Sequence, residues 1–311
     1  MHLAILDAKT LGKDSQLRCF EEFGKVQTYA NTTPDELVQR LENVDIVITN
    51  KVKIRKDTMV KCPKLKLICI TATGMDNIDL DAAAELGIEV KNVAGYSTHS
   101  VAQHTFALVL ELLTHVSYYD NFVKNDGWVQ SPIFTHIDNP IREIHGKKWG
   151  IIGLGAIGKQ VATIAQAFGA KIWYHSTSGK NTNSDYPRTD LKNLLSQSDI
   201  VSIHAPFNEK TKGLIGKDEL ALMKKDALLI NVGRGGIIDE VALKDALENE
   251  QIYAGLDVLA TEPMAPDAPL RELTCKERLV ITPHVAWASI EARATLIDQV
   301  MNNIKTFLKE S

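Results

Sequence analysis

The sequence has 311 residues, 44% of them hydrophobic and 24% charged, and its formal net charge is −4. That length allows two hydrophobic cores of ordinary size. The slight negative charge and the lack of a basic block argue against nucleic acid or a membrane surface as a partner. No apolar run reaches the ~18 residues that suggest a membrane span. The four cysteines show neither C-x-x-C spacing nor a disulfide framework, so we expect reduced thiols, no metal site and a cytoplasmic location.

The first hundred residues alternate apolar, β-branched runs with helical patterns. Thr33 and Glu36 form a capping box around Pro34, which predicts that a helix begins there. Strands are expected at 3–6, 26–29, 45–49, 65–71 and 88–93, and helices at 17–23, 34–41 and 79–86. This alternation predicts a parallel sheet with helices on both faces.

A long helix and an irregular segment follow. Residues 101–113 are apolar on most sides at helical spacing, which predicts a buried helix. A polar, irregular segment is expected from there to about Gly146. The chain closes with an amphipathic pattern over residues 289–309, and we expect this helix to pack on the first domain.

A glycine-rich turn follows the apolar run at Trp149–Ile152. Gly153, Gly155 and Gly158 have the spacing G-x-G-x-x-G, and a helical pattern comes next. In a dinucleotide site these glycines allow a tight turn, a close approach to the pyrophosphate and close packing of helix on strand. The helix also points its free N–H groups at the phosphates. The alternative interpretation is a packing turn without a ligand.

Polar side chains follow three of the strands expected after this turn. The six strands are expected at 150–153, 171–174, 200–204, 227–232, 252–257 and 279–282. Arg234, Glu262 and His284 come shortly after the last three. Ligands bind beyond the carboxyl ends of the strands in such a sheet, so these side chains should share one crevice with the cofactor.

These three residue types suit the reduction of a 2-keto acid. Arg234 can hold a carboxylate and a carbonyl with its planar fork of donors. His284 can exchange a proton near neutral pH, and Glu262 would favour its imidazolium form. Taken singly, each residue is also compatible with a structural role; three at neighbouring strand ends favour catalysis.

In these motifs the sequence resembles the D-isomer-specific 2-hydroxyacid dehydrogenases, over essentially its whole length. The matching stretches are Ala72–Asp79, Gly153–Gly158, His204–Pro206, Asn231–Gly236, Asp257 with Glu262–Pro263, and Pro283–Trp287. The resemblance implies an oxidoreductase that acts on a CH–OH group with NAD or NADP.

The resemblance also implies the fold and the assembly. The expected fold is α/β, with two doubly wound parallel-sheet domains. Residues 99–284 would form a Rossmann dinucleotide-binding domain, and residues 1–98 plus 285–311 a discontinuous, flavodoxin-like substrate-binding domain. Hinges are expected near Ser97–Val101 and after His284. Family members are usually dimers, so we expect a homodimer whose interface includes the 101–113 helix and the segment after it.

The site residues of the family can be placed on this sequence. The catalytic residues fall on Arg234, Glu262 and His284. The substrate carboxylate would bind the backbone N–H groups of Thr73 and Gly74, and the remaining substrate contacts fall on Asn50, Lys51, Arg234 and His284. Cofactor contacts fall on Gly153, Gly155, Ala156, Ile157, Gly158, His175, Ser176, Thr177, His204, Ala205, Pro206, Val232, Gly233 and Asp257.

Within the family, three segments look like those of glycerate dehydrogenases, also called hydroxypyruvate reductases: Thr49–Lys51, Gly95–Thr98 and His284–Trp287. We therefore expect a small 2-keto acid such as hydroxypyruvate or glyoxylate as substrate. A D-lactate dehydrogenase or a broader 2-keto acid reductase is the enzymatic alternative. A dinucleotide-sensing, corepressor-like binding protein is the non-enzymatic one.

One position departs from the dinucleotide fingerprint. An acidic residue usually ends the second strand and binds the ribose hydroxyls, but His175 stands there. Ser176, Thr177 and Lys180 could bind a 2′-phosphate instead, although no arginine is near. We expect NAD, with NADP as the open alternative.

Overall fold

The computed structural model describes residues 1–310. The chain divides into two compact units: Met1–Ser97 together with the segment that begins at Ala288, and Thr98–Trp287. The sequence placed these boundaries at 98/99 and 284/285, whereas the units change at 97/98 and 287/288. No helix within residues 1–310 is long and apolar enough to cross a membrane.

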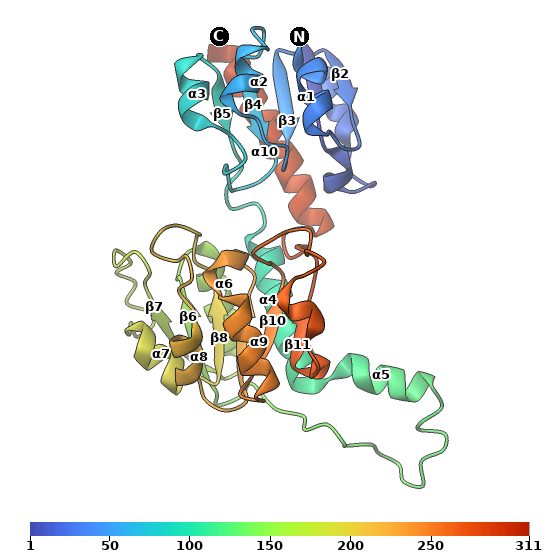
Figure 1. The fold of residues 1–311 in the computed structure, drawn as a ribbon, viewed down its shortest axis with the longest axis vertical. Coiled ribbons are helices and arrows are strands. Elements are labelled where there is room, and N and C mark those ends of the chain that lie inside the picture. The colour runs from blue at the N-terminus through green and yellow to red at the C-terminus, as the bar shows by residue number, and fades with distance from the viewer. Residues whose placement is uncertain (311) are drawn as a thin grey trace. The chain divides into compact units, whose positions relative to one another are not determined.

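The first unit contains a five-stranded parallel sheet in the order β2-β1-β3-β4-β5 (Figure 1). Its strands are β1 His2–Ile5, β2 Lys25–Thr28, β3 Ile46–Thr49, β4 Leu67–Ile70 and β5 Glu89–Lys91. This is the flavodoxin-like order, so the expected fold of the first domain is confirmed. The order reverses between β1 and β3, and a ligand site is therefore expected beyond the ends of these two strands.

Helices cover both faces of this sheet. The three short helices α1 Pro34–Leu41, α2 Lys56–Val60 and α3 Leu80–Glu85 share one apolar cluster with the sheet. The long helix α10, Ile290–Glu310, packs against β4 from the other side, with Leu296, Val300 and Ile304 buried. Residues 8–11 (η1) and 17–23 (η2) form 3₁₀ turns, so the helix expected at 17–23 is not an α-helix.

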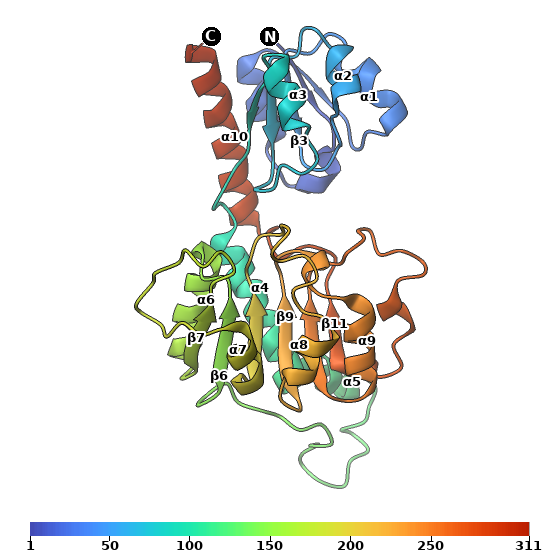
Figure 2. The ribbon, with the colours of Figure 1, turned by 60° about the vertical axis from the view of Figure 1, so that its left-hand side comes forward.

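The second unit contains a six-stranded parallel sheet in the order β11-β10-β9-β8-β6-β7 (Figure 2). Its strands are β6 Lys148–Ile152, β7 Lys171–His175, β8 Ile200–Ile203, β9 Ala227–Asn231, β10 Ile252–Leu256 and β11 Leu279–Ile281. A single bridge between Tyr174 and Arg188 stands where a classical dinucleotide-binding sheet has one more strand. The order reverses between β6 and β8, next to the glycine-rich turn.

Two layers of helices enclose this second sheet. The helices α4 Thr98–Thr114 and α6 Ala156–Ala167 share one apolar cluster with it. On the opposite face lie α7 Leu191–Gln197, α8 Lys217–Leu222 and α9 Glu240–Glu248. Short 3₁₀ turns η3 Gly235–Ile237, η4 Pro269–Glu272 and η5 Lys276–Arg278 complete the unit. The buried α4 was expected from its apolar pattern.

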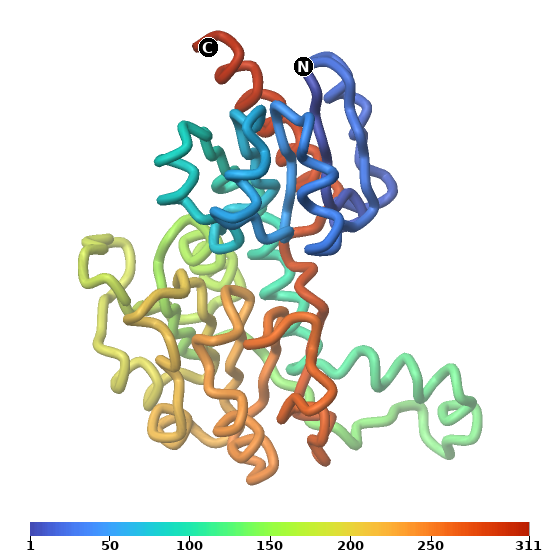
Figure 3. Tube along the Cα trace, turned by 45° about the horizontal axis from the view of Figure 1, so that its top comes forward, coloured from blue at the N-terminus to red at the C-terminus, as the bar shows by residue number. Residues whose placement is uncertain are grey.

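The segment after α4 corrects in part the expectation of a polar, irregular segment up to Gly146, because its first residues are helical while residues 125–147 have neither helix nor strand. Residues 116–124 form the helix α5, and Figure 3 shows this segment leaving the body of the second unit before it returns to β6. The ring of His136 stacks on Phe122 at 3.8 Å and contacts Tyr118 and Tyr119. These aromatic contacts give the segment a local core, although none of the α5 side chains is buried. We call residues 116–141 the arm.

Candidate active site

The glycine-rich turn joins the end of β6 to the start of α6. Gly153 has a φ of 92°, a conformation that side chains disfavour, and a Cβ on Gly158 would lie 2.3 Å from the Gly153 carbonyl oxygen. At Gly155, no atom from a distant part of the described chain lies within 4 Å of the place of a Cβ. The first N–H groups of α6, which begins directly after Gly155, lack partners within the helix. The turn therefore has the room and the donors that a pyrophosphate requires.

A cavity of about 620 Å³ opens above this turn. It lies beyond the ends of β6, β7 and β8, at the switch point of the sheet, where α/β sheets bind ligands. Its lining consists of Gly153, Leu154, Gly155, Ser176, Thr177, Ser178, Lys180, Asn181, His204, Pro206, Asn208, Glu209 and Lys210. The size, the open glycine and the polar lining fit a dinucleotide.

The remaining predicted cofactor residues lie near the same edge of the sheet. These are Ala156, Ile157 and Gly158 in the first turn of α6, His175 at the end of β7, Ala205 after β8, Val232 and Gly233 after β9, and Asp257 after β10. None of these eight lines the cavity itself. Their contacts with a cofactor stay predictions.

The loop after β7 is fixed to the glycine-rich turn. Asn181 donates from Nδ2 to the Leu154 carbonyl at 2.7 Å, and its N–H donates to Ser176 Oγ at 3.4 Å. His175 Nδ1 lies 3.3 Å from the Thr189 carbonyl. Among the described residues that line the cavity, Glu209 is the only carboxylate, while Lys180 and Lys210 are cationic. The end of the cavity that would receive the ribose thus lacks the usual acidic residue beside β7.

His204 is a neutral, desolvated wall of this cavity. Its Nε2 lies 3.0 Å from Ser202 Oγ, which also accepts a hydrogen bond from the buried Trp149 indole at 2.9 Å. Burial lowers the pKa of His204 to about 3, because the imidazolium form loses its hydration there. Its Nδ1 is buried and has no hydrogen-bond partner among the described residues.

Arg234 lies in a turn that a buried asparagine fixes. Asn231 accepts from the Gly233 N–H at 3.0 Å and donates to the Arg234 carbonyl at 2.9 Å, and it is 1% exposed. A Cβ on Gly235 would lie 1.8 Å from the carbonyl carbon of Leu259, so only glycine permits this approach. The close contact joins the Arg234 turn to the loop that carries Glu262.

Glu262 and His284 form a hydrogen-bonded pair. His284 Nδ1 lies 2.6 Å from Glu262 Oε2, and the other carboxylate oxygen accepts from the Leu259 N–H at 3.0 Å. The side chains are partly exposed, 24% for His284 and 36% for Glu262. Because Nδ1 is engaged, Nε2 is the ring nitrogen that can reach a ligand.

The three predicted catalytic residues follow neighbouring strands. Arg234 comes after β9, Glu262 after β10 and His284 after β11, and these strands are adjacent in the sheet. Asn231, Leu256 and Ile281 lie in register at their carboxyl ends. The fold therefore brings the three residues to one edge of one sheet, the edge that also holds the glycine-rich turn.

The predicted substrate residues of the first unit follow two adjacent strands: Asn50 and Lys51 come after β3, at the switch point, and Thr73 and Gly74 after β4. Asp7, 3% exposed, follows β1 and accepts hydrogen bonds from the N–H groups of Asn50 at 2.9 Å and Lys51 at 2.7 Å. The Thr73 hydroxyl donates to the Val93 carbonyl at 3.0 Å, which fixes the turn that Gly74 continues. The substrate contacts of these four residues stay predictions.

Sequence reasoning missed the polar residues that fix the loops: Asp7, Asn181 and Asn231. Asn231 is the last residue of β9, and Asp7 lies two residues beyond the end of β1. That position was a usable signal, because a polar side chain there meets the backbone N–H groups of the neighbouring loop. Asn181 lies in a polar loop and gave no comparable signal.

The fold and this site define a class: an α/β oxidoreductase with an NAD(P)-binding domain. The sequence profile of the D-isomer specific 2-hydroxyacid dehydrogenase, NAD binding domain, matches residues 106–286. The chain belongs to the D-isomer specific 2-hydroxyacid dehydrogenase family, and it is an enzyme that acts on CH–OH groups with NAD or NADP.

Individual relatives cover nearly the whole chain. The chain is 39% identical over 311 residues to the glycerate dehydrogenase of Methylorubrum extorquens, covering 98% of this chain and 96% of that protein. It is 37% identical over 320 residues to the hydroxypyruvate reductase of Blautia hydrogenotrophica, covering 100% and 98%. A solved acyclic imino acid reductase in complex with NADPH and D-Arg has a TM-score of 0.87 at 32% identity, covering 100% and 98%.

The lowered pKa of His204 predicts a pH dependence of stability. The native protein resists protonation of this ring down to about pH 3, whereas the unfolded chain protonates it near the ordinary value of 6.5. The stabilising contribution is thus complete above pH 6.5 and decreases as the pH falls toward 3. The free energy of unfolding in urea should therefore decrease less between pH 7.5 and pH 5 in His204→Gln than in the wild type. The control variant His99→Gln, at an exposed position, should show the same decrease as the wild type. An equal dependence of the unfolding free energy on pH in all three proteins would contradict the lowered pKa of His204.

Proposed function

We propose that this enzyme reduces a small 2-keto acid, such as hydroxypyruvate or glyoxylate, to the D-2-hydroxy acid, in the manner of a D-glycerate dehydrogenase. The observation that carries the reaction is the His284–Glu262 pair at 2.6 Å, on the sheet edge that also holds Arg234. The similarity to a glycerate dehydrogenase and a hydroxypyruvate reductase supports the substrate. A D-lactate dehydrogenase or a broader 2-keto acid reductase is the alternative.

Arg234 orients the substrate in this proposal. One guanidinium nitrogen, Nη1, donates to the Gly233 carbonyl at 2.9 Å, which holds the base of the fork. The remaining donors can bind the carboxylate and the carbonyl oxygen together. This arrangement polarises the carbonyl and stabilises the negative charge that develops on its oxygen.

His284 moves the proton. The Glu262 carboxylate accepts from Nδ1–H, which orients the ring and leaves Nε2 for the substrate. During reduction Nε2–H gives its proton to the carbonyl oxygen; during oxidation the neutral Nε2 takes the hydroxyl proton back. The bound NADH or NADPH supplies the hydride that completes the reduction.

For the cofactor we propose NAD, with NADP use as the alternative. The ribose end of the cavity has Ser176, Thr177 and Lys180 but no acidic residue beside His175, which removes a repulsion against a 2′-phosphate. The backbone of Thr73 and Gly74 and the residues Asn50 and Lys51 stay the predicted substrate contacts of the first unit. The cytoplasmic location also stays a prediction.

We further propose that two copies of the chain associate through the arm. The arm exposes large apolar side chains, with Phe134 88% and Ile137 72% accessible, and Val129 and Trp128 exposed as well. Exposed large apolar side chains gathered in one segment of the chain favour an interface with another protein. A second copy of the chain is the partner that the family resemblance implies.

A substrate panel tests the reaction. Purified enzyme should reduce hydroxypyruvate and glyoxylate with a kcat/KM at least about tenfold above that for pyruvate and bulkier 2-keto acids, because the expected pocket is small. NADH and NADPH should be compared in every assay. Preference for pyruvate would favour the D-lactate alternative, and tight NADH binding without turnover of any acid would favour a binding protein. A kcat/KM more than about tenfold higher with NADPH would overturn the NAD assignment.

Arg234→Lys tests the planar fork. The variant keeps the charge but loses the bidentate geometry, so kcat/KM for the keto acid should fall about 100-fold while NADH binding is retained. Arg18→Lys, at an exposed position of the first unit, is the control and should match the wild type. Near-native kinetics of the Arg234 variant would remove this residue from the site.

The double variant Phe134→Ser/Ile137→Ser tests the dimer. We expect the wild-type protein to sediment at twice the mass of one chain. The dissociation constant of the dimer should be at least about tenfold higher in the variant, because the burial of two apolar side chains is lost. Val241→Ser removes an exposed apolar side chain from α9 and should leave the dimer intact. A monomeric wild type, or a variant that dimerises equally well, would contradict the proposal.

A further inference from the structure

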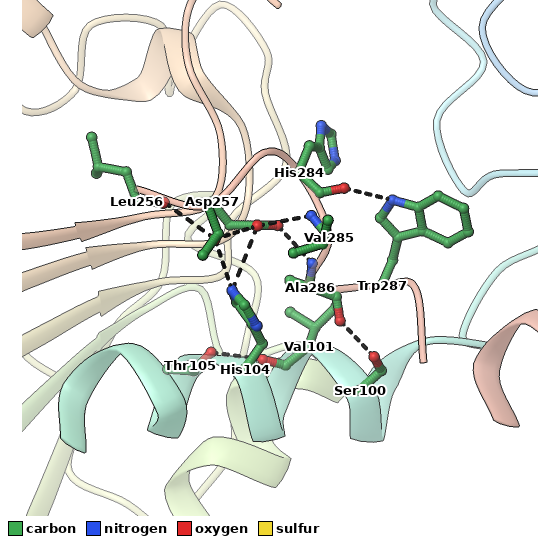
Figure 4. Close-up of polar contacts among 11 residues, drawn as sticks. Ser100, Val101, His104, Thr105, Leu256, Asp257, His284, Val285, Ala286 and Trp287 are labelled. Atoms are coloured by element: carbon green, nitrogen blue, oxygen red, sulfur yellow. Dashed lines mark hydrogen bonds and ion pairs between the residues drawn. The ribbon is translucent and has the colours of Figure 1, made fainter. Parts of the chain in front are cut away.

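A second histidine lies beneath the loop that carries His284. His104 is on α4, and Figure 4 shows it rising from this helix toward Asp257. Its Nε2 lies 2.8 Å from Thr282 Oγ1 and 3.5 Å from Asp257 Oδ1. The His104 side chain is 20% exposed and that of Asp257 is fully buried. The sequence gave no reason to single out His104.

The direction of each hydrogen bond follows from the chemistry of the groups. The Thr282 hydroxyl lies 2.6 Å from Asp257 Oδ1, and a carboxylate only accepts, so the hydroxyl proton points to Asp257. The Thr282 oxygen must then accept from His104. His104 therefore carries a proton on Nε2, and the three side chains form one directed chain from α4 to the carboxylate.

Asp257 in turn fixes the backbone of residues 284–286. Its Oδ1 accepts from the Val285 N–H and its Oδ2 from the Ala286 N–H, both at 2.8 Å, and its carbonyl accepts from the His284 N–H at 2.9 Å. His284 has a φ of 54°, a conformation that a non-glycine residue holds only when its surroundings impose it.

Two more contacts complete the restraint on this loop. The Trp287 indole donates to the His284 carbonyl at 2.9 Å, and the Ser100 hydroxyl of α4 donates to the Ala286 carbonyl at 2.6 Å (Figure 4). The helix α4 is thus connected to the loop at two points one turn apart. Ser100 contacts the loop directly, whereas His104 is connected to it through Thr282 and Asp257.

We propose that His104 is a positioning residue for the proton-transfer step, a role that rests on the function proposed above. It acts through the Thr282 hydroxyl, which its N–H holds in the orientation that donates to Asp257. The Asp257 carboxylate then keeps both oxygens aligned with the loop, and the loop keeps the His284 ring against Glu262. Without the His104 donor the hydroxyl is free to turn toward the Leu256 carbonyl, 3.5 Å away.

Two variants of His104 distinguish a positioning role of its N–H donor from a role in packing alone. His104→Gln keeps an amide donor at a similar reach, whereas His104→Leu keeps bulk but no donor. We expect kcat for keto-acid reduction to fall about tenfold in the Leu variant and to stay within about threefold of wild type in the Gln variant. The KM for NADH should change in neither. Gln103→Leu, at the exposed neighbouring position, is the matched control.

A double-variant cycle tests whether His104 acts through the Thr282 hydroxyl. Thr282→Val removes the hydroxyl at nearly constant shape and should lower kcat as much as His104→Leu does. If His104 acts through Thr282, the combination should be no worse than either single variant. Additive losses, or equal activity of the Gln and Leu variants at position 104, would overturn the proposal.

Hydrogen exchange gives a readout that does not depend on turnover. Deuterium uptake at the amides of Val285 and Ala286 should rise in His104→Leu and Thr282→Val, and should stay at the wild-type level in His104→Gln. Unchanged protection in the Leu variant would overturn the positioning role even if the substrate assignment holds. Absence of keto-acid reduction by the wild type, with the exchange pattern as expected, would refute only the proposed function.

Discussion

The Asp257 carboxylate is the constraint on which the candidate active site depends. It is 1% exposed, and a buried carboxylate is stable only when donors surround it. Those donors are two backbone N–H groups of the His284 loop and the Thr282 hydroxyl. The need to satisfy one buried group at the end of β10 thus dictates the path of the chain after β11, and that path decides where the imidazole of His284 stands.

The first unit uses the same device at its own switch point. Asp7, at the end of β1, accepts from the N–H groups of Asn50 and Lys51 after β3. In both units an acidic side chain at one strand end fixes the loop that follows another strand. A parallel sheet makes this possible because its strands end at one edge, where loops from distant parts of the chain meet.

The chemistry of the site divides between fixed and exposed groups. Asn231, Asp257 and Ser202 are buried and fully engaged, so they hold backbone and rings in place. Glu262 and His284, the pair to which we assign the proton transfer, are partly exposed. His204 belongs to neither set, since burial keeps it neutral while its buried Nδ1 has no partner among the described residues. The rigid groups supply the preorganisation that transition-state stabilisation requires.

The sequence alone determined the two α/β domains, because apolar strands and amphipathic helices recur at spacings that admit few other folds. It also determined the glycine-rich turn and the strand ends that carry Arg234, Glu262 and His284. It failed at the arm, where the apolar side chains of residues 116–141 face outward and give no pattern of a buried face. The contacts of His104, Asn231 and Gly235 were decided only by the tertiary structure. His104 contacts a residue 178 positions away, and Gly235 is needed because the backbone of Leu259 occupies the place of a side chain. Contacts of this kind depend on where the sheet brings distant loops, which no local pattern records.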